Sequence, residues 1–129
     1  MDNQKINLTE AEWNVMECLW EHHPKTGREI VDQLYVQMGW SRSTTLTLLK
    51  RLEEKGAVGS ESTGTIKQFY PCITRELAAL QETEDFLKRV YKGSLGMMVI
   101  AFTKKQSLTK TEIDELYAIL GELEVNADD

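Results

Sequence analysis

The sequence predicts a mainly α-helical protein in two parts: three helices with a β-hairpin, and then three further helices. Two prolines and eight glycines among 129 residues leave long stretches free to form helix. Apolar residues recur at helical spacing in these stretches, and three helices open with a capping box, in which a Thr and a Glu satisfy each other's backbone amides. A hydrophobic share of 41% excludes a disordered chain and allows a modest core.

Three helices are predicted before residue 57. The first begins after Thr9, the first residue of a capping box, and its apolar residues follow every three or four positions. The second begins after Thr26, which opens another capping box, and ends at Gly39. The third begins after Ser41 and ends at Gly56, a typical stop signal for a helix.

The pattern then changes from helix to strand. Residues 57–61 and 66–70 are predicted as two short strands, joined by a turn over residues 62–65. Three helices followed by a hairpin are the order of elements in a winged helix, a variant of the helix-turn-helix. We expect this N-terminal winged helix-turn-helix domain to occupy residues 1–73.

Residues 74–129 are predicted to form a C-terminal three-helix dimerisation region. A long helix is expected over residues 75–92, a short one follows, and a capping box at Thr109 opens the last. Their apolar stripes need a partner surface, which a second chain would supply in a symmetric homodimer. The alternative is that these helices fold back onto the N-terminal domain. The residues expected at the dimer contact are Leu77, Leu80, Phe86, Leu87, Val90, Tyr91, Leu95, Met98, Val99, Phe102, Ile113, Leu116, Tyr117 and Leu120.

Charge is distributed unevenly along the chain. The 15 basic and 21 acidic residues give a formal net charge of −6, which is unlike most nucleic-acid-binding proteins. Residues 40–75 nevertheless carry six basic against three acidic residues, or +3, while residues 1–39 and 76–129 carry −4 and −5. Such asymmetry can mark a nucleic-acid-binding face, and an ordinary fluctuation in composition is the alternative.

The third helix has the polar face that such binding needs. At 100° per residue, one side of this helix carries Thr45, Leu48, Leu49 and Leu52. The opposite side carries hydroxyl groups and basic side chains. Hydroxyls can contact base edges or phosphates, and basic side chains are suited to phosphates. The alternative is a solvated polar face without a ligand. The predicted phosphate contacts are Arg42, Lys50, Arg51 and Lys55, with Lys67 on the hairpin.

Several other classes of protein are not expected. The longest apolar run, residues 97–102, is too short to cross a membrane, and the N-terminus lacks a signal-peptide profile, so a cytoplasmic location is predicted. Cys18 and Cys72 make no disulfide framework. His22 and His23 have no partners at metal-ligand spacing, so no metal or cofactor is expected. Catalytic motifs are also missing, which argues against an enzyme.

Short stretches from about Leu8 to Leu123 have the order and spacing of a known family. They are residues 11–16 with Leu19 and Trp20, Trp40 and Ser41 with Thr44, Thr47, Leu48, Arg51 and Leu52, then Lys55 and Gly56, Tyr70, and residues 86–93. Together they resemble the penicillinase-repressor family, the BlaI/MecI/CopY group of winged-helix transcriptional repressors. The resemblance implies a homodimer that binds an inverted repeat in a promoter and blocks transcription.

The resemblance also implies which residues read DNA. In the family, the start of the third helix contacts the bases, and the matching positions are Ser43, Thr44, Leu46 and Thr47. Ser43 and Leu46 stand where the antibiotic-resistance members carry a Lys and an Arg. The hydroxyl pair of Thr44 and Thr47 is retained, so an operator core of the TACA/TGTA type is expected.

Release from DNA is the last property that the resemblance implies. Antibiotic-resistance members are cleaved in the fifth helix, between an Asn and a Phe, after a membrane-bound sensor metallopeptidase detects a β-lactam. The matching bond is Ala101–Phe102, which retains only the Phe. The C-terminus has no Cys-x-Cys pair of the copper-responsive members. The alternative function is a winged-helix module that binds protein without sequence-specific DNA binding.

Overall fold

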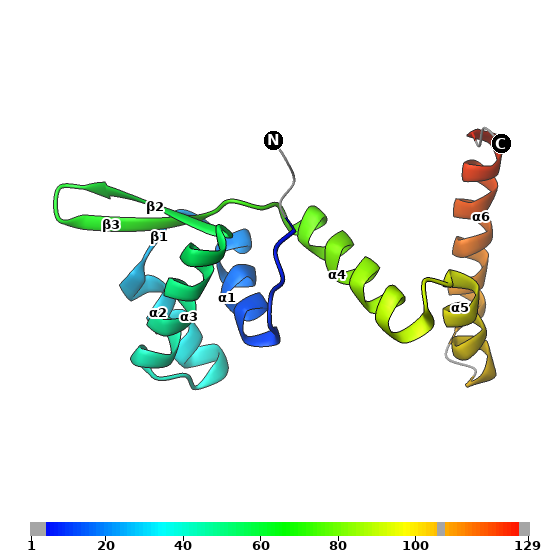
Figure 1. Cartoon of the computed structure of the whole chain (residues 1–129), viewed down its shortest axis with the longest axis horizontal. Coiled ribbons are helices and arrows are strands. Elements are labelled where there is room, and N and C mark those ends of the chain that lie inside the picture. Colours follow the sequence, from blue (N-terminus) through cyan, green and yellow to red (C-terminus); the bar gives the residue numbers. More distant parts are fainter. Residues whose placement is uncertain (1–4, 106–107, 127–129) are drawn as a thin grey trace. The chain divides into compact units, whose positions relative to one another are not determined.

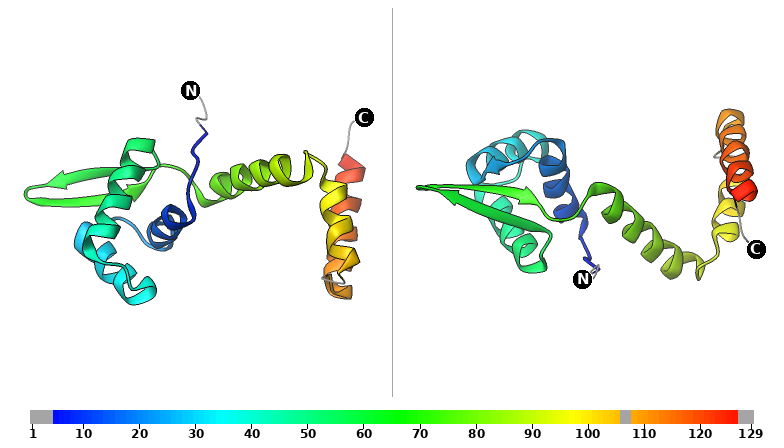
Figure 2. Two further views of the ribbon diagram at one scale, coloured as in Figure 1. Left: turned by 60° about the horizontal axis from the view of Figure 1, so that its bottom comes forward. Right: turned by 90° about the horizontal axis from the view of Figure 1, so that it is seen from above.

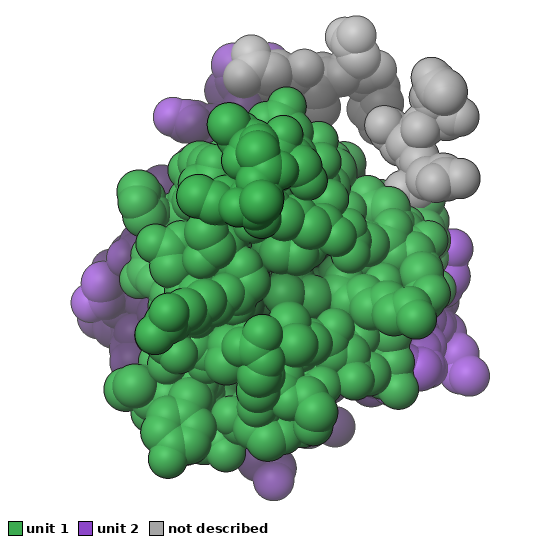
Figure 3. Space-filling view, turned by 90° about the vertical axis from the view of Figure 1, so that its left-hand side faces the viewer, with its two compact units in different colours: residues 1–83 green, residues 84–129 purple. Residues whose placement is uncertain are grey.

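A computed structural model describes residues 5–105 and 108–126, and the described chain is mainly helical with one small sheet (Figure 1). Two compact units divide between Thr83 and Glu84, and Figure 3 shows them in separate colours. We call them the N-terminal and the C-terminal unit. This division falls inside a helix, later than the boundary between residues 73 and 74 that we placed after the hairpin.

The N-terminal unit begins with the three helices that the sequence predicts: α1 (Glu10–Glu21), α2 (Gly27–Met38) and α3 (Arg42–Lys55). Both predicted capping boxes are present, because the hydroxyls of Thr9 and Thr26 each accept from a backbone amide three residues on, at 3.1 Å. The first turn of each helix is therefore satisfied by its own sequence. Gly39 and Gly56 end α2 and α3 in the left-handed conformation, with φ of 73° and 82°.

The sheet contains one strand more than we expected. β2 (Val58–Thr63) and β3 (Ile66–Pro71) form the predicted antiparallel hairpin, and the short β1 (Lys25–Thr26) pairs with β3 on its other side. The predicted four-residue turn over residues 62–65 is wrong. Thr63 pairs directly with Ile66, and Gly64, at φ 65°, closes a two-residue turn that few other residues could form.

A single core lies where α1, α2 and α3 meet the base of the hairpin (Figure 2). α3 contributes the four residues that its helical spacing turns inward, and all four are buried. They are Thr45, Leu48, Leu49 and Leu52. Buried residues of the other elements complete the core, among them Val15, Met16, Leu19, Ile30, Leu34, Val58 and Phe69. The opposite face of α3 is thereby left in solvent.

The rest of the described chain is helical: α4 (Arg75–Tyr91), α5 (Leu95–Lys104) and α6 (Lys110–Asn126). Thr109 and Glu112 form the predicted capping box of α6, with backbone-to-side-chain hydrogen bonds of 2.9 and 3.1 Å. In the C-terminal unit, α5 and α6 lie side by side (Figures 1 and 2). No residue of α5, and none of α6 up to residue 125, is buried. Among the described residues, no helix combines the length and the apolar character needed to cross a membrane.

Candidate nucleic-acid interface

The exposed start of α3 carries a group of hydroxyls linked by hydrogen bonds. Ser41 caps the helix by accepting from the amide of Thr44 at 3.2 Å, and its own Oγ donates to Thr44 Oγ1 at 3.1 Å. The hydroxyls of Ser41 and Ser43 lie 3.2 Å apart. The cap thus holds its neighbours' hydroxyls at a helix N-terminus, where backbone N–H groups favour an anion such as a phosphate.

The four residues predicted to contact bases do not share one environment. Ser43, Thr44 and Thr47 are exposed on the outer side of α3. Leu46 is half-buried and packs against the core, near Gly27 at the start of α2. The reading face therefore consists of three hydroxyls with an aliphatic edge, and Leu46 has less freedom to reach a base than its helical position suggests.

Three of the predicted phosphate contacts are available to a ligand. Arg42, Lys50 and Arg51 are exposed, and no ion pair with another described residue engages them. Lys67 is exposed on β3, and its ammonium lies 3.7 Å from a carboxylate oxygen of Glu53. Three of these cations lie on α3 and the fourth lies on β3, the second strand of the hairpin.

Lys55, also predicted as a phosphate contact, is already paired within the fold. Its ammonium donates to the carbonyl of Asn7 at 2.6 Å and lies 2.5 Å from a carboxylate oxygen of Glu12, which is only 1% exposed. Burial alone would raise the pKa of Glu12, but the hydrogen bonds from Lys55 and Thr9 and the charge of Lys55 outweigh it and lower that pKa. Lys55 therefore joins the end of α3 to α1 and is committed to this pair.

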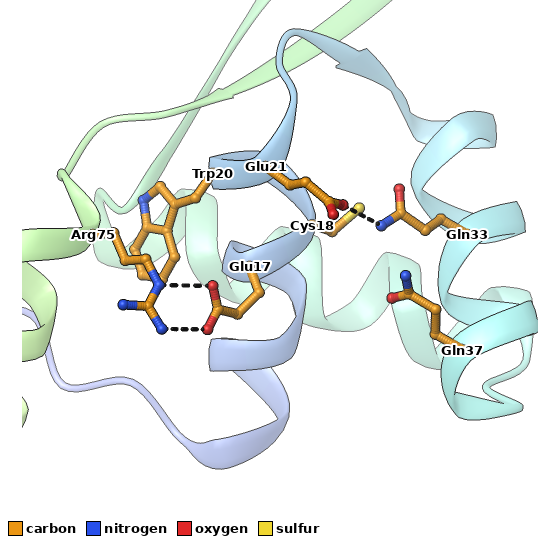
Figure 4. Close-up of a pocket in the computed structure, with 7 residues that line it drawn as sticks. All are labelled: Glu17, Cys18, Trp20, Glu21, Gln33, Gln37 and Arg75. Atoms are coloured by element: carbon orange, nitrogen blue, oxygen red, sulfur yellow. Dashed lines mark hydrogen bonds and ion pairs between the residues drawn. The ribbon is translucent and has the colours of Figure 1, made fainter.

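A polar hollow of about 340 Å³ is lined by α1, α2 and the start of α4 (Figure 4). Arg75 donates two hydrogen bonds to Glu17, at 2.9 and 2.8 Å, and Gln33 donates to Glu21 at 3.3 Å. The hydrogen bond from Arg75, aided by one from Trp13, lowers the pKa of Glu17 despite partial burial. This network, which we did not predict, fastens the first turn of α4 to α1.

Groups that bind metals are not gathered in the described part of the chain. No cluster of three or more His, Cys, Asp or Glu is placed to hold an ion among those residues. Cys18 is buried and Cys72 is exposed. His23 contacts the carbonyl of Leu19 at 2.8 Å, in the last turn of α1.

The predicted dimer residues leave a large apolar surface uncovered in this single chain. Four are half-buried in the C-terminal unit, and Leu77 packs against the core of the N-terminal unit. Those four are Leu87, Tyr91, Met98 and Val99. The other nine are exposed: Leu80, Phe86, Val90, Leu95, Phe102, Ile113, Leu116, Tyr117 and Leu120. The predicted cleavage bond, Ala101–Phe102, lies inside α5, with Ala101 half-buried and Phe102 exposed.

Three helices around one core, an exposed third helix and an adjoining hairpin define a winged helix-turn-helix protein. The sequence model of the family described as penicillinase repressor matches residues 8–122. The chain belongs to the penicillinase repressor family.

Relatives and solved structures agree with this membership. The methicillin resistance regulatory protein MecI of Staphylococcus aureus is 31% identical over 121 residues, which cover 94% of this chain and 98% of MecI. The penicillinase repressor of Bacillus licheniformis is 34% identical over 115 residues, covering 89% and 90%. The DNA-binding domain of the repressor BlaI superposes with a TM-score of 0.52 at 28% identity, over 57% of this chain and 90% of that one. Monomeric B. licheniformis BlaI in complex with the blaP half-operator gives the same TM-score at 29% identity, with 57% and 89% covered.

Proposed function

We propose that this protein is a transcriptional repressor that binds an inverted-repeat operator as a homodimer. The observation that carries the proposal is the outer face of α3, where exposed hydroxyls and cations with no ion pair to another described residue stand together. Ser43, Thr44 and Thr47 supply groups that can hydrogen-bond to base edges in a major groove. Arg42, Lys50 and Arg51 flank them with charges that suit phosphates.

The relatives support DNA as the partner. Two of them are named as a penicillinase repressor and a resistance regulatory protein, and a BlaI domain with a similar fold was solved with a half-operator. A half-operator bound by a monomer fits a site with two equivalent halves. The proposal for this chain is accordingly one α3 in each half-site, with the two halves related by the symmetry of a dimer.

The exposed apolar residues of the C-terminal unit support the dimer. Soluble monomers rarely expose contiguous apolar patches larger than a few hundred Å², and larger patches usually mark interaction sites. Here α5 and α6 expose Leu95, Phe102, Ile113 and Leu120 among others. A second copy offers the same apolar residues, so a symmetric contact can bury both sets at once.

The acidity of the chain makes it more important that the dimer binds two half-sites at once. A dimer would carry twice −6, or −12, so non-specific attraction to DNA is weak. The basic patch of α3 and the hairpin offsets this only locally. Affinity must therefore come from two half-sites read together. Lys55 is left out of the phosphate contacts because it is paired with Glu12.

Binding to duplexes at several salt concentrations tests the proposal. The protein should bind an inverted repeat from its own promoter region, and the affinity should fall steeply as salt rises, since each phosphate contact releases counterions. Thr47→Ala should alter sequence preference, whereas Lys50→Ala should weaken all duplexes alike. If micromolar protein binds no duplex at ~50 mM salt, the rival function, a protein-binding winged helix, is favoured instead.

We extend the proposal to release by cleavage at Ala101–Phe102, in response to a β-lactam-type signal passed on by a sensor metallopeptidase. Support comes from the position of this bond within α5, where Phe102 is also a residue of the proposed dimer contact. Cleavage there would divide the dimerisation region and so separate the two DNA-binding domains. In cells that carry such a sensor, exposure to a β-lactam should yield a fragment that ends at residue 101. Intact protein after induction would contradict this part of the proposal.

A further inference from the structure

One carboxylate on the recognition helix contacts both strands of the hairpin, which we call the wing. Glu53 lies near the end of α3, and its Oε2 accepts a hydrogen bond from Ser60 Oγ of β2 at 3.2 Å. The same oxygen lies 3.7 Å from Nζ of Lys67 on β3. A single side chain of α3 thus holds the first and the second strand of the wing.

The strand register explains why both partners face the same helix. Ser60 lies opposite Phe69, and Lys67 lies two residues before Phe69 on β3, so all three share one face of the ladder. Phe69 is buried in the core, and Nζ of Lys67 lies 5.1 Å from the centre of its ring. Burial of Phe69 therefore fixes the base of the wing, and Glu53 adds polar contacts with the wing through Ser60 and Lys67.

A negative charge at this place needs an explanation if the surface binds DNA. Glu53 lies on the same helix as the basic residues, and a carboxylate there repels phosphates. Its side chain is only 31% exposed, and partial burial of a carboxylate does not by itself stabilise a fold. The benefit we find is geometric: the carboxylate adds a second restraint on the long side chain of Lys67, beside the contact of its ammonium with the Phe69 ring.

We propose that Glu53 is the positioning residue of this interface, which sets the wing on α3 so that Lys67 meets a phosphate in register with the bases that α3 reads. The inference rests on the proposed DNA-binding function and names a determinant of that function. Glu53 contacts no DNA itself. It acts through Ser60 and Lys67, which are its partners on the two strands.

The neighbouring residue supplies a matched control. Glu54 carries the same charge one position further along α3 and is exposed, and the hydrogen bonds and ion pairs of the described chain do not connect it to the wing. Glu53→Ala and Glu54→Ala each delete one carboxylate from the same helix. Lost repulsion raises the affinity for operator and random duplexes alike, so the ratio of the two affinities reports the positioning effect in each variant.

Operator and random-sequence duplexes are titrated with both variants at several salt concentrations. We expect Glu53→Ala to lower the ratio of operator to random affinity about fivefold, and Glu54→Ala to leave that ratio unchanged. Glu53→Ala should also make the dependence of affinity on salt less steep. The slope of log affinity against log salt concentration should fall in magnitude by up to about 0.9 per protomer, which is the share of one phosphate contact. In a Lys67→Ala background, Glu53→Ala should cause no further loss of slope, because the residue it positions is absent.

Ser60→Ala is the second variant, since it removes one of the two wing contacts without changing charge, and it should lower the ratio in the same direction. Thermal unfolding curves show which variants are folded. The inference is overturned if folded Glu53→Ala keeps the wild-type ratio of operator to random affinity and the wild-type dependence on salt. If Glu53→Ala does not fold, the same result with folded Ser60→Ala overturns it. Failure of the proposed function would give a different result, because the wild-type protein itself would then bind operator and random duplexes equally.

Discussion

Single residues decide whether the polar groups near α3 are satisfied. Thr45 is 0% exposed near the start of α3, and its hydroxyl is a buried side-chain atom without a hydrogen-bond partner among the described residues. Helical spacing predicts that this position faces inward, but spacing cannot show whether a hydroxyl finds a partner there. An unsatisfied buried hydroxyl costs about 1–3 kcal/mol.

We therefore predict that Thr45→Val stabilises the protein. Valine has nearly the shape of threonine and removes the buried hydroxyl, so the free energy of unfolding should rise by about 1 kcal/mol. Urea titration followed by circular dichroism measures the change. Thr47→Val is the control, because Thr47 is exposed on the same helix and its replacement should change stability little. A Thr45→Val protein less stable than the wild type would contradict the account.

The pair of Lys55 and Glu12 links stability to pH. Because the folded state lowers the pKa of Glu12, its ionised carboxylate stabilises the fold above its ordinary pKa of 4.5, and this contribution is lost as pH falls through the lowered value. Lys55→Met leaves a buried charge without its partner. It should cost about 2–3 kcal/mol at pH 7 and less near pH 4, where Glu12 in the variant takes up a proton.

Thermal unfolding of wild type and Lys55→Met between pH 7 and pH 3.5 tests this prediction. The difference in Tm should narrow as pH falls. Lys50→Met is the control, since Lys50 is exposed, and its effect should be small and independent of pH. A loss in Lys55→Met that is equally large at all pH values would contradict the role assigned to Glu12.

At the scale of elements, local signals in the sequence were sufficient for the helices and insufficient for the sheet. Capping residues and terminal glycines mark the ends of α1, α2 and α3 because those interactions are local. β1 was missed because Lys25 and Thr26 form a strand only through pairing with Phe69 and Gln68, far along the chain. The ion pairs of Lys55 and Arg75 were missed for the same reason, because their partners, Glu12 and Glu17, lie far away in the sequence on α1.

Replacing the cap residue of α3 tests how much that cap stabilises the helix. Ser41→Ala removes the acceptor for the amide of Thr44, which should lower the free energy of unfolding by about 1 kcal/mol. Operator affinity should fall as well, because the hydroxyl of Thr44 loses its partner. Ser43→Ala is the control for stability, since its hydroxyl caps no amide. Equal stability of the two variants in urea titration would contradict the capping role.

At the scale of the whole molecule, we propose that a second copy covers the exposed apolar residues of the C-terminal unit. We predict that the wild type sediments with twice the monomer mass of 14.8 kDa and that Leu120→Glu shifts it to the monomer. Leu120 is 54% exposed on α6, and a charge there opposes burial in an apolar contact. Glu115→Gln, on the same helix, should leave the dimer intact. Sedimentation equilibrium distinguishes these results, and a Leu120→Glu dimer would contradict the contact as proposed.

In the proposed complex, two copies of α3 read two halves of one operator. Selection of bound duplexes from a random pool is the decisive experiment. It should enrich an inverted repeat whose half-sites lie one helical turn, or about 10 base pairs, apart, or a multiple of that spacing. Enrichment of a lone half-site, or of no sequence at all, would contradict it.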